Sequence, residues 1–197
     1  MPKKLGSEAL EQALRLLAEK LEFDRAEPVS LVVCGGASLI ALGLVSRTTK
    51  DVDVLALMDE QGRLLPSDPL PESVSRAVSE IAGQLDLYPN WLNGGPTDLL
   101  KWGLPQGFRD RLTRRDYGAR LTIWHVSRLD QIHFKVFAAT DAGPGRHVDD
   151  LLQLKPTKAE LLSAARWALT QDASEGFVTI LKEMLRELGH EDIAKQV

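Results

Sequence analysis

The stretch VVCGGASLIALGLVSRTTKDVDVLAL, residues 32–57, decides the fold of the first half of the chain. An apolar run predicts a strand over 29–34, buried on both faces, which ends at a Gly-Gly pair. A short helix is expected over 37–44, directly after the glycines, and a second apolar run predicts a strand over 52–57. The stretch therefore predicts two strands joined by a glycine turn and a helix.

Two aspartates, Asp51 and Asp53, lie at the start of the second predicted strand. Residues i and i+2 of a strand point to the same side, so the two carboxylates share one face. Carboxylates this close repel each other, and burial raises the cost of charging both. A divalent cation removes the repulsion, and Mg²⁺ prefers oxygen ligands of this kind together with substrate phosphates. The alternative is an exposed strand tip where water solvates both side chains.

The glycine turn before the short helix suggests a phosphate cradle. Gly35 and Gly36 let backbone N–H groups approach a phosphate closely, and Ser38 lies where the helix begins. A plain tight turn packed against the sheet is the alternative. Arg47 and Thr49 precede the aspartates, where they can contact an anion or orient the first carboxylate. Together these residues predict a phosphate cradle beside a metal-binding carboxylate pair.

The rest of the chain adds one further strand and several helices. Ser7, Ser127 and Thr157 are candidate helix N-caps. The patterns predict a strand over 120–126, long loops over 59–71 and 88–112, and helices over 7–21, 72–87, 127–140, 148–154, 157–169 and 174–188. This order predicts an α+β fold with a small mixed sheet flanked by helices. We expect an α/β core over 1–126 and a helical C-terminal region over 127–197 that packs on the core.

Composition restricts the class of protein. The net charge of -4 and the pI near 5.6 argue against a broadly electropositive nucleic-acid binder, although a local basic patch remains open. The single cysteine, Cys34, excludes an internal disulfide and suits a reducing compartment; we expect it in the core rather than as a nucleophile. The sequence has no signal-peptide pattern and no apolar run of about 18 residues. A cytoplasmic protein without membrane association is expected.

The motif GGAS…RTTKDVDV resembles the signature of the nucleotidyltransferase fold, the polymerase-beta-like superfamily. The spacer over 37–50 is slightly longer than the commonest form and is usual in the AbiEii-type toxin branch. The stretch FKVFAATDAGPGRHVDDLLQLKPTKAELLSAARW, residues 134–167, is similar to the second half of uncharacterised bacterial nucleotidyltransferase-like proteins of that branch, and NWLN over 90–93 also fits. The resemblance covers 29–167.

The resemblance implies a role for each matching residue. Gly35, Gly36 and Ser38 would hold the β- and γ-phosphates of an NTP. Asp51 and Asp53 would bind one or two Mg²⁺ ions, which align an attacking hydroxyl with the α-phosphate and stabilise the pyrophosphate that leaves.

Two residues downstream complete the implied site. Lys135 would neutralise phosphate charge, and Asp150 matches the aspartate of a D-L-x-x-L stretch, with Asp149 as the alternative. The family's third carboxylate is missing, because the strand RLTIWHV over 120–126 contains no acid. Either Asp149 or Asp150 substitutes for it, or catalysis is impaired.

The resemblance implies a Mg²⁺-dependent nucleotidyltransferase that acts on an NTP and modifies RNA, including tRNA, or a protein. It also raises a toxin–antitoxin role with a cognate antitoxin or toxin as partner. The alternative is a catalytically weak protein of the same fold that binds a nucleotide or a partner.

Two further features stay open from the sequence. The segment RDRLTRRDYGAR, residues 109–120, contains five arginines that can guide RNA phosphates, or it forms a solvated face with its aspartates. Trp91 and Trp102 can stack on a base, but packing of their loop onto the protein body is the favoured interpretation.

Overall fold

The structure, a computed structural model, describes residues 1–143 and 145–197. The chain divides into two units, the first formed by Met1–Lys101 with Arg109–Val126, and the second by Trp102–Phe108 with Ser127–Val197. Each unit has its own architecture. Among the described residues, no helix combines the length and apolar character needed to cross a membrane.

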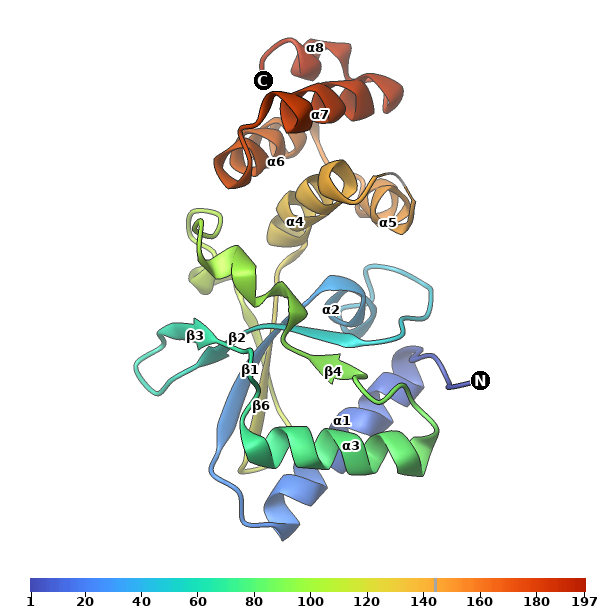
Figure 1. Ribbon diagram of the computed structural model, residues 1–197, viewed down its shortest axis with the longest axis vertical. Coiled ribbons are helices and arrows are strands. Elements are labelled where there is room, and N and C mark those ends of the chain that lie inside the picture. The colour runs from blue at the N-terminus through green and yellow to red at the C-terminus, as the bar shows by residue number, and fades with distance from the viewer. Residues whose placement is uncertain (144) are drawn as a thin grey trace. The chain divides into compact units, whose positions relative to one another are not determined.

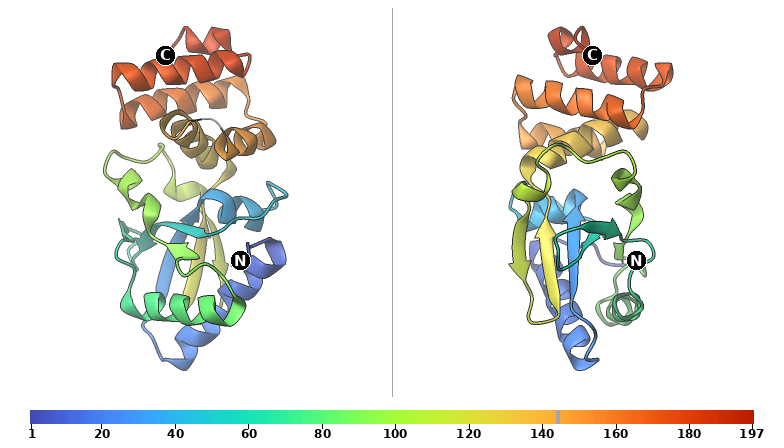
Figure 2. Two further views of the ribbon diagram at one scale, coloured as in Figure 1. Left: turned by 45° about the vertical axis from the view of Figure 1, so that its right-hand side comes forward. Right: turned by 90° about the vertical axis from the view of Figure 1, so that its left-hand side faces the viewer.

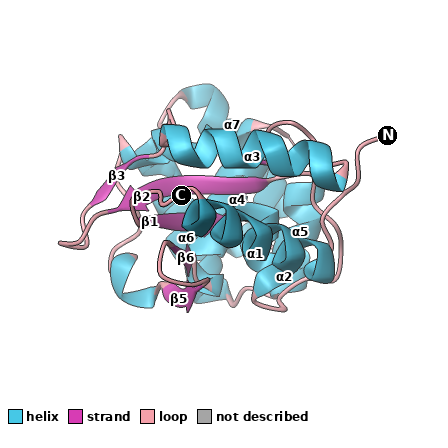
Figure 3. Ribbon diagram, turned by 90° about the horizontal axis from the view of Figure 1, so that it is seen from below, coloured by secondary structure: helices cyan, strands magenta, loops and turns pink. Residues whose placement is uncertain are grey.

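A six-stranded mixed sheet forms the centre of the first unit, with strand order β3-β2-β1-β6-β5 and β4 paired to β2 (Figure 1, Figure 3). Strand β1 is antiparallel to β2 and parallel to β6. The strands are β1 (Val29–Cys34), β2 (Val52–Met58), β3 (Leu64–Pro66), β4 (Leu92–Asn93), β5 (Thr113–Asp116) and β6 (Leu121–His125). The helices are α1 (Ser7–Phe23), α2 (Gly35–Ala41) and α3 (Glu72–Leu85), with 3-10 turns η1 (Gly95–Leu100) and η2 (Arg109–Arg111).

Helix α1 buries an apolar stripe that its leucines form at helical spacing. Leu10, Leu14, Leu17 and Leu21 are all at most 2% exposed. The expected cap at Ser7 is wrong: the helix already includes Ser7, and the N-cap position, Gly6, provides no side-chain hydrogen bond. Burial of the stripe, and not capping, therefore stabilises the start of this helix.

Strand pairing separates two faces of the sheet. Ile123 and Arg115 pair across β6 and β5, and Arg115 forms an ion pair with Glu11 of α1, so this face is covered by α1. Residues alternate between faces, so Trp124 lies on the opposite face. Asp53 lies on that opposite face too, because it pairs with Cys34 of β1, two residues beyond the partner of Trp124. Figure 2 shows β1 and β6 side by side in both views.

The second unit is built from helices. They are α4 (Arg128–Asp141), α5 (Arg146–Leu154), α6 (Lys158–Gln171), α7 (Glu175–Glu187) and α8 (Glu191–Ala194). The capping box of Thr157 and Glu160 is confirmed, with both of its hydrogen bonds present. The ring of Trp167 packs against Phe134 and Phe137 of α4 at centroid distances of 5.5 and 6.2 Å, which fixes α4 against α6.

The structure confirms the α+β class and the helical C-terminal part, but it corrects the predicted loops. Strand β3 lies inside the predicted loop over 59–71, and η1 and β4 lie inside the one over 88–112. Strand β5 and helix α8 have no counterpart among the predicted elements. Trp91 is fully buried and its Nε1 donates a hydrogen bond to the Val78 carbonyl, as packing predicts, whereas Trp102 is 67% exposed.

Candidate functional site

The two aspartates lie where β2 begins, in the middle of the sheet. Asp53 is flanked by Cys34 at the end of β1 and by Asn93 of β4. Asp51 directly precedes the strand, and both aspartates are half-buried. The carboxylates are therefore placed at the edge of the sheet from which the glycine turn leaves. The sequence argument missed Asn93, for which the motif NWLN was the available signal.

The glycine turn touches the aspartate site closely enough that side chains are excluded. Gly35 has a φ of +65°, and a Cβ there would lie 2.6 Å from Asp53 Oδ2. A Cβ on Gly36 would lie 2.7 Å from Arg47 Nη2 and 3.0 Å from Thr49 Oγ1. The distances of 2.6 and 2.7 Å are shorter than real Cβ contacts, so a larger residue at either position would have to displace Asp53 or Arg47. The structure thus brings together the glycine turn, one aspartate, a guanidinium and a hydroxyl.

Thr49 contacts Asp51 through its hydroxyl group. Its side chain is buried, and its Oγ1 lies 3.3 Å from Asp51 Oδ1 and 3.2 Å from the Asp51 carbonyl oxygen. Arg47 is half-buried, and its Nη1 donates a hydrogen bond of 2.9 Å to the Thr48 carbonyl. Of the two roles expected for these residues, Thr49 has the geometry to orient Asp51, and Arg47 places positive charge beside Gly36.

Ser38 lies in α2, but its side chain is directed into the protein. It is fully buried, and its Oγ donates a hydrogen bond of 3.3 Å to the carbonyl of Val126. The hydroxyl therefore ties α2 to the residue that follows β6. Contact between Ser38 and a phosphate stays a prediction from the resemblance.

Lys135 and Asp150 belong to the second unit, where they bind each other. Lys135 Nζ lies 2.7 Å from Asp150 Oδ2, and the two side chains are 7% and 0% exposed. The pair joins α4 to α5 across the interior of the helical unit. Asp149, the alternative acid, is exposed in the first turn of α5. The catalytic roles expected for these residues stay predictions.

His125 is a buried group that the sequence argument did not distinguish from other structural histidines. It is 2% exposed, and within the described residues neither ring nitrogen has a hydrogen-bond partner. The pKa of His125 is lowered from 6.5 to about 4; burial is the largest cause, the positive charge of Arg115 acts in the same direction, and Glu11 opposes it. His125 shares the face of Ile123 and is therefore on the α1 side of the sheet, opposite Asp53. It is uncharged at neutral pH.

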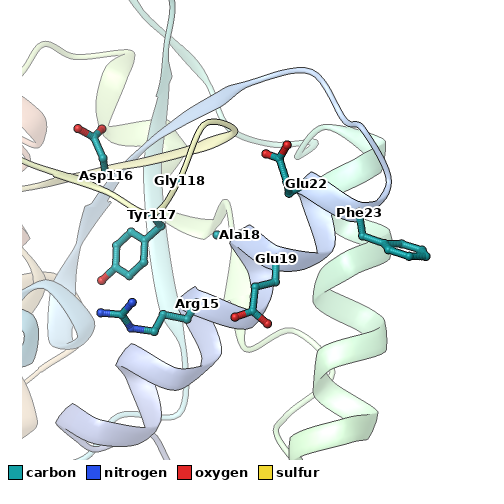
Figure 4. A pocket seen from close by; sticks show the side chains of 8 residues that line it. All are labelled: Arg15, Ala18, Glu19, Glu22, Phe23, Asp116, Tyr117 and Gly118. Atoms are coloured by element: carbon teal, nitrogen blue, oxygen red, sulfur yellow. The ribbon is translucent and has the colours of Figure 1, made fainter.

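A separate pocket of about 510 Å³ lies between α1 and the turn after β5 (Figure 4). Figure 4 shows the Arg15 guanidinium close to the Tyr117 ring, with Phe23 directed away from that ring. Its wall also carries three carboxylates, Glu19, Glu22 and Asp116, against the single cation. A triphosphate would meet net negative charge there, so this pocket does not suit an NTP.

The aspartate site has donors that suit Mg²⁺. Two half-buried carboxylates supply hard oxygen ligands, and the Asp53 carboxylate packs directly against Gly35. Across the described part of the chain, no group of three or more His, Cys, Asp or Glu side chains forms a metal cluster. The remaining ligands of such an ion would be water and nucleotide phosphates, as is usual for Mg²⁺.

A family model described as "Nucleotidyltransferase of unknown function (DUF6036)" matches residues 10–150. No curated protein and no solved structure matches the chain. The matched range includes the glycine turn, both aspartates, Lys135 and Asp150, while the AbiEii branch stays a prediction. Because the match covers well over half of the sequence, the chain belongs to the DUF6036 family of nucleotidyltransferases of unknown function.

Proposed function

We propose that this chain is a Mg²⁺-dependent nucleotidyltransferase that moves a nucleotidyl group from an NTP to RNA or to a protein. The observation that carries the proposal is the contact between the glycine turn and Asp53. A Cβ on Gly35 would stand 2.6 Å from Asp53 Oδ2, so the turn is shaped around that carboxylate. A nucleotide phosphate at this turn would lie directly beside both acids.

Each residue of the site has a distinct task in this proposal. The backbone N–H groups of Gly35 and Gly36 would bind the phosphates, and Arg47 would add positive charge next to them. Asp51, oriented by Thr49, and Asp53 would hold the metal ion. When bound, Mg²⁺ neutralises the charge that develops on the phosphates.

The reaction has a simple balance. The acceptor hydroxyl oxygen forms a bond to the α-phosphorus, and the bond from that phosphorus to the pyrophosphate oxygen breaks. The hydroxyl proton leaves to solvent or to a carboxylate. Pyrophosphate is released.

A second candidate is a catalytically weak protein of the same fold that binds a nucleotide or a partner. It is favoured by the ion pair of Lys135 with Asp150, because an acid held 2.7 Å from an ammonium is a poor substitute for the missing strand carboxylate. A toxin–antitoxin role rests only on the resemblance to the AbiEii-type branch. Expression of the chain with and without a neighbouring partner gene tests that role through cell growth.

The decisive experiment incubates the protein with each α-labelled NTP, Mg²⁺, and total RNA or protein from cells. Asp51→Asn and Asp53→Asn remove one charge each, and Glu60→Gln removes a charge from an exposed residue in the next loop as the matched control. We expect labelled product with the wild type and with Glu60→Gln, and loss of at least about 100-fold with either aspartate variant. Labelling that survives both aspartate substitutions contradicts the proposal.

The same samples separate the two candidates. A rise in melting temperature with Mg²⁺ and an NTP, but without labelled product on any acceptor, supports the binding protein and rejects the enzyme. Turnover at rates of about 1 s⁻¹ or more rejects the binding protein.

A further inference from the structure

The face of the sheet that carries Asp53 also carries an aromatic ring and an arginine. Cys34 and Val32 are alternate residues of β1, so they share a face; Cys34 pairs with Asp53, and Val32 pairs with Trp124. Arg114 of β5 pairs with Trp124 and extends the same row to the sheet edge. The metal-binding acid and the two side chains therefore project to one side.

Arg114 is held above the indole ring. Its guanidinium carbon lies 5.6 Å from the centroid of Trp124, a cation–π geometry. Its Nε donates a hydrogen bond of 2.9 Å to Asp116 Oδ1, and that oxygen also accepts a hydrogen bond of 2.8 Å from Thr122. These bonds lower the pKa of Asp116, with the Thr122 hydrogen bond as the largest cause. Arg114 itself is 57% exposed, so its planar group remains available to a ligand.

The segment that contains Arg114 is basic although the protein is acidic. Residues 109–116 contain four arginines and two aspartates, in a chain whose net charge is -4. Arg109 is exposed, and Arg114 is exposed on the edge strand, whereas Arg115 is on the α1 face, where it pairs with Glu11. The local charge favours an anionic ligand, and the indole ring and guanidinium plane favour a flat one.

The distance to the aspartates suits an oligomer rather than a mononucleotide. Strand spacing and rise place Trp124 two strands and two residues from Asp53, which is about 12 Å between Cα atoms. A chain of nucleotides that ends at the aspartates would pass over this row. A free NTP would be held by its phosphates at the glycine turn, at the Asp53 end of this row and away from Trp124 and Arg114.

We propose that the acceptor is a single-stranded nucleic acid, whose base stacks on the pair of Trp124 and Arg114 and whose backbone phosphate contacts Arg114. The inference rests on the proposed nucleotidyl transfer and names its acceptor class. A protein acceptor is the competing outcome.

Binding is measured first, without NTP or Mg²⁺, by fluorescence anisotropy with a labelled single-stranded RNA of about 12 nucleotides and the same sequence as DNA. Arg114→Ala and Trp124→Leu are each expected to weaken binding about tenfold. Arg115→Ala is the matched control, because it removes the same charge from the same strand but on the α1 face. It should bind within about twofold of wild type, whereas Arg114→Ala should lower the slope of log K against log salt by about 1.

Melting temperatures of all variants show whether a loss of binding reflects unfolding. Equal weakening by Arg114→Ala and Arg115→Ala, or no binding by the wild type at about 50 mM salt, overturns the inference. Transfer of label to protein but never to nucleic acid also overturns it, while the proposed function stands. Binding that depends on Arg114 without transfer to any acceptor rejects the proposed function and leaves the stacking surface as a binding site.

Discussion

Acidification should destabilise the first unit through one side chain, His125. Its pKa lies at about 4 in the folded protein, below the ordinary value of 6.5, because burial disfavours the imidazolium. Nearby charges act in opposite senses, since Arg115 on β5 disfavours the imidazolium and Glu11 on α1 favours it. The unfolded chain therefore binds the proton more tightly than the folded chain. Stability is complete above the unfolded pKa and falls as the pH drops below about 6.5.

The two pKa values give the size of the effect. At 1.36 kcal/mol for each pH unit, the gap corresponds to a loss of about 2 kcal/mol at about pH 5 and about 3 kcal/mol at about pH 4. Little screening by solvent is expected, because His125 is only 2% exposed. Carboxylates add their own pH dependence, so the informative quantity is a difference between two proteins.

The measurement is urea unfolding of the wild type and of His125→Leu between about pH 7 and about pH 4, followed by tryptophan fluorescence. The variant should lose about 3 kcal/mol less than the wild type over this range. Parallel curves for the wild type and His125→Leu would show that the buried imidazole is not protonated on unfolding, and the reasoning would fail.

Three further predictions concern the glycine turn and the helical unit. Gly35→Ala and Gly43→Ala should each cost about 1 kcal/mol in backbone strain, since both glycines have positive φ, but only Gly35→Ala should abolish the thermal shift with Mg²⁺ and an NTP, because its Cβ displaces Asp53. Lys135→Met should lower the free energy of unfolding by about 3 to 5 kcal/mol, because it leaves Asp150 buried without this cation, and adding a hydrophobic substitution at position 150 should restore most of it. Thr157→Ala should cost about 1 kcal/mol in urea unfolding, because it removes the side-chain acceptor of the capping box.

Each of these predictions has an outcome that contradicts it. If Mg²⁺ and an NTP raise the melting temperature of Gly35→Ala and Gly43→Ala equally, Gly35 has no specific role in nucleotide binding at Asp53. A double variant as unstable as Lys135→Met would mean that the methionine itself disturbs the packing of α4. For the capping box, Thr179→Ala on the exposed side of α7 is the control. If Thr157→Ala and Thr179→Ala lower the free energy of unfolding equally, the capping box does not stabilise α6.

Local signals predicted much of the fold. Apolar periodicity located α1 and β1, and the Thr157 capping box located the start of α6, because these patterns act within a few residues. Strand β5 was not predicted, because all four residues of Thr113–Asp116 are exposed and the sequence TRRD has no apolar alternation. Its strand geometry comes from pairing with β6, which is a tertiary property.

For the candidate site too, the sequence predicted the local features but not the contacts between distant side chains. The sequence located Asp53 at the start of the second strand, and the Gly-Gly pair marked a close backbone approach. Asp51 precedes β2, so its expected position on the same side as Asp53 stays a prediction. That Gly35 would be shaped around Asp53, and that Lys135 would be bound to Asp150, depends on side chains that meet only after the chain has folded. A sequence read one segment at a time does not contain these contacts.

The position of β1 has a consequence for synthesis of the protein. β1 needs β2 on one side and β6 on the other. Ser38, in the helix that follows β1, and Val126, directly after β6, are 88 residues apart. At about 5 to 20 residues per second, a ribosome leaves the β6 side of β1 unpaired for roughly 5 to 20 seconds. An apolar strand with an open edge is a template for wrong pairing and a target for chaperones. The helices of the second unit follow one another within residues 128–194, and α4 packs chiefly against α6, so their partners are synthesised soon after each other. The nascent chain is therefore most vulnerable while its nucleotidyltransferase core is incomplete.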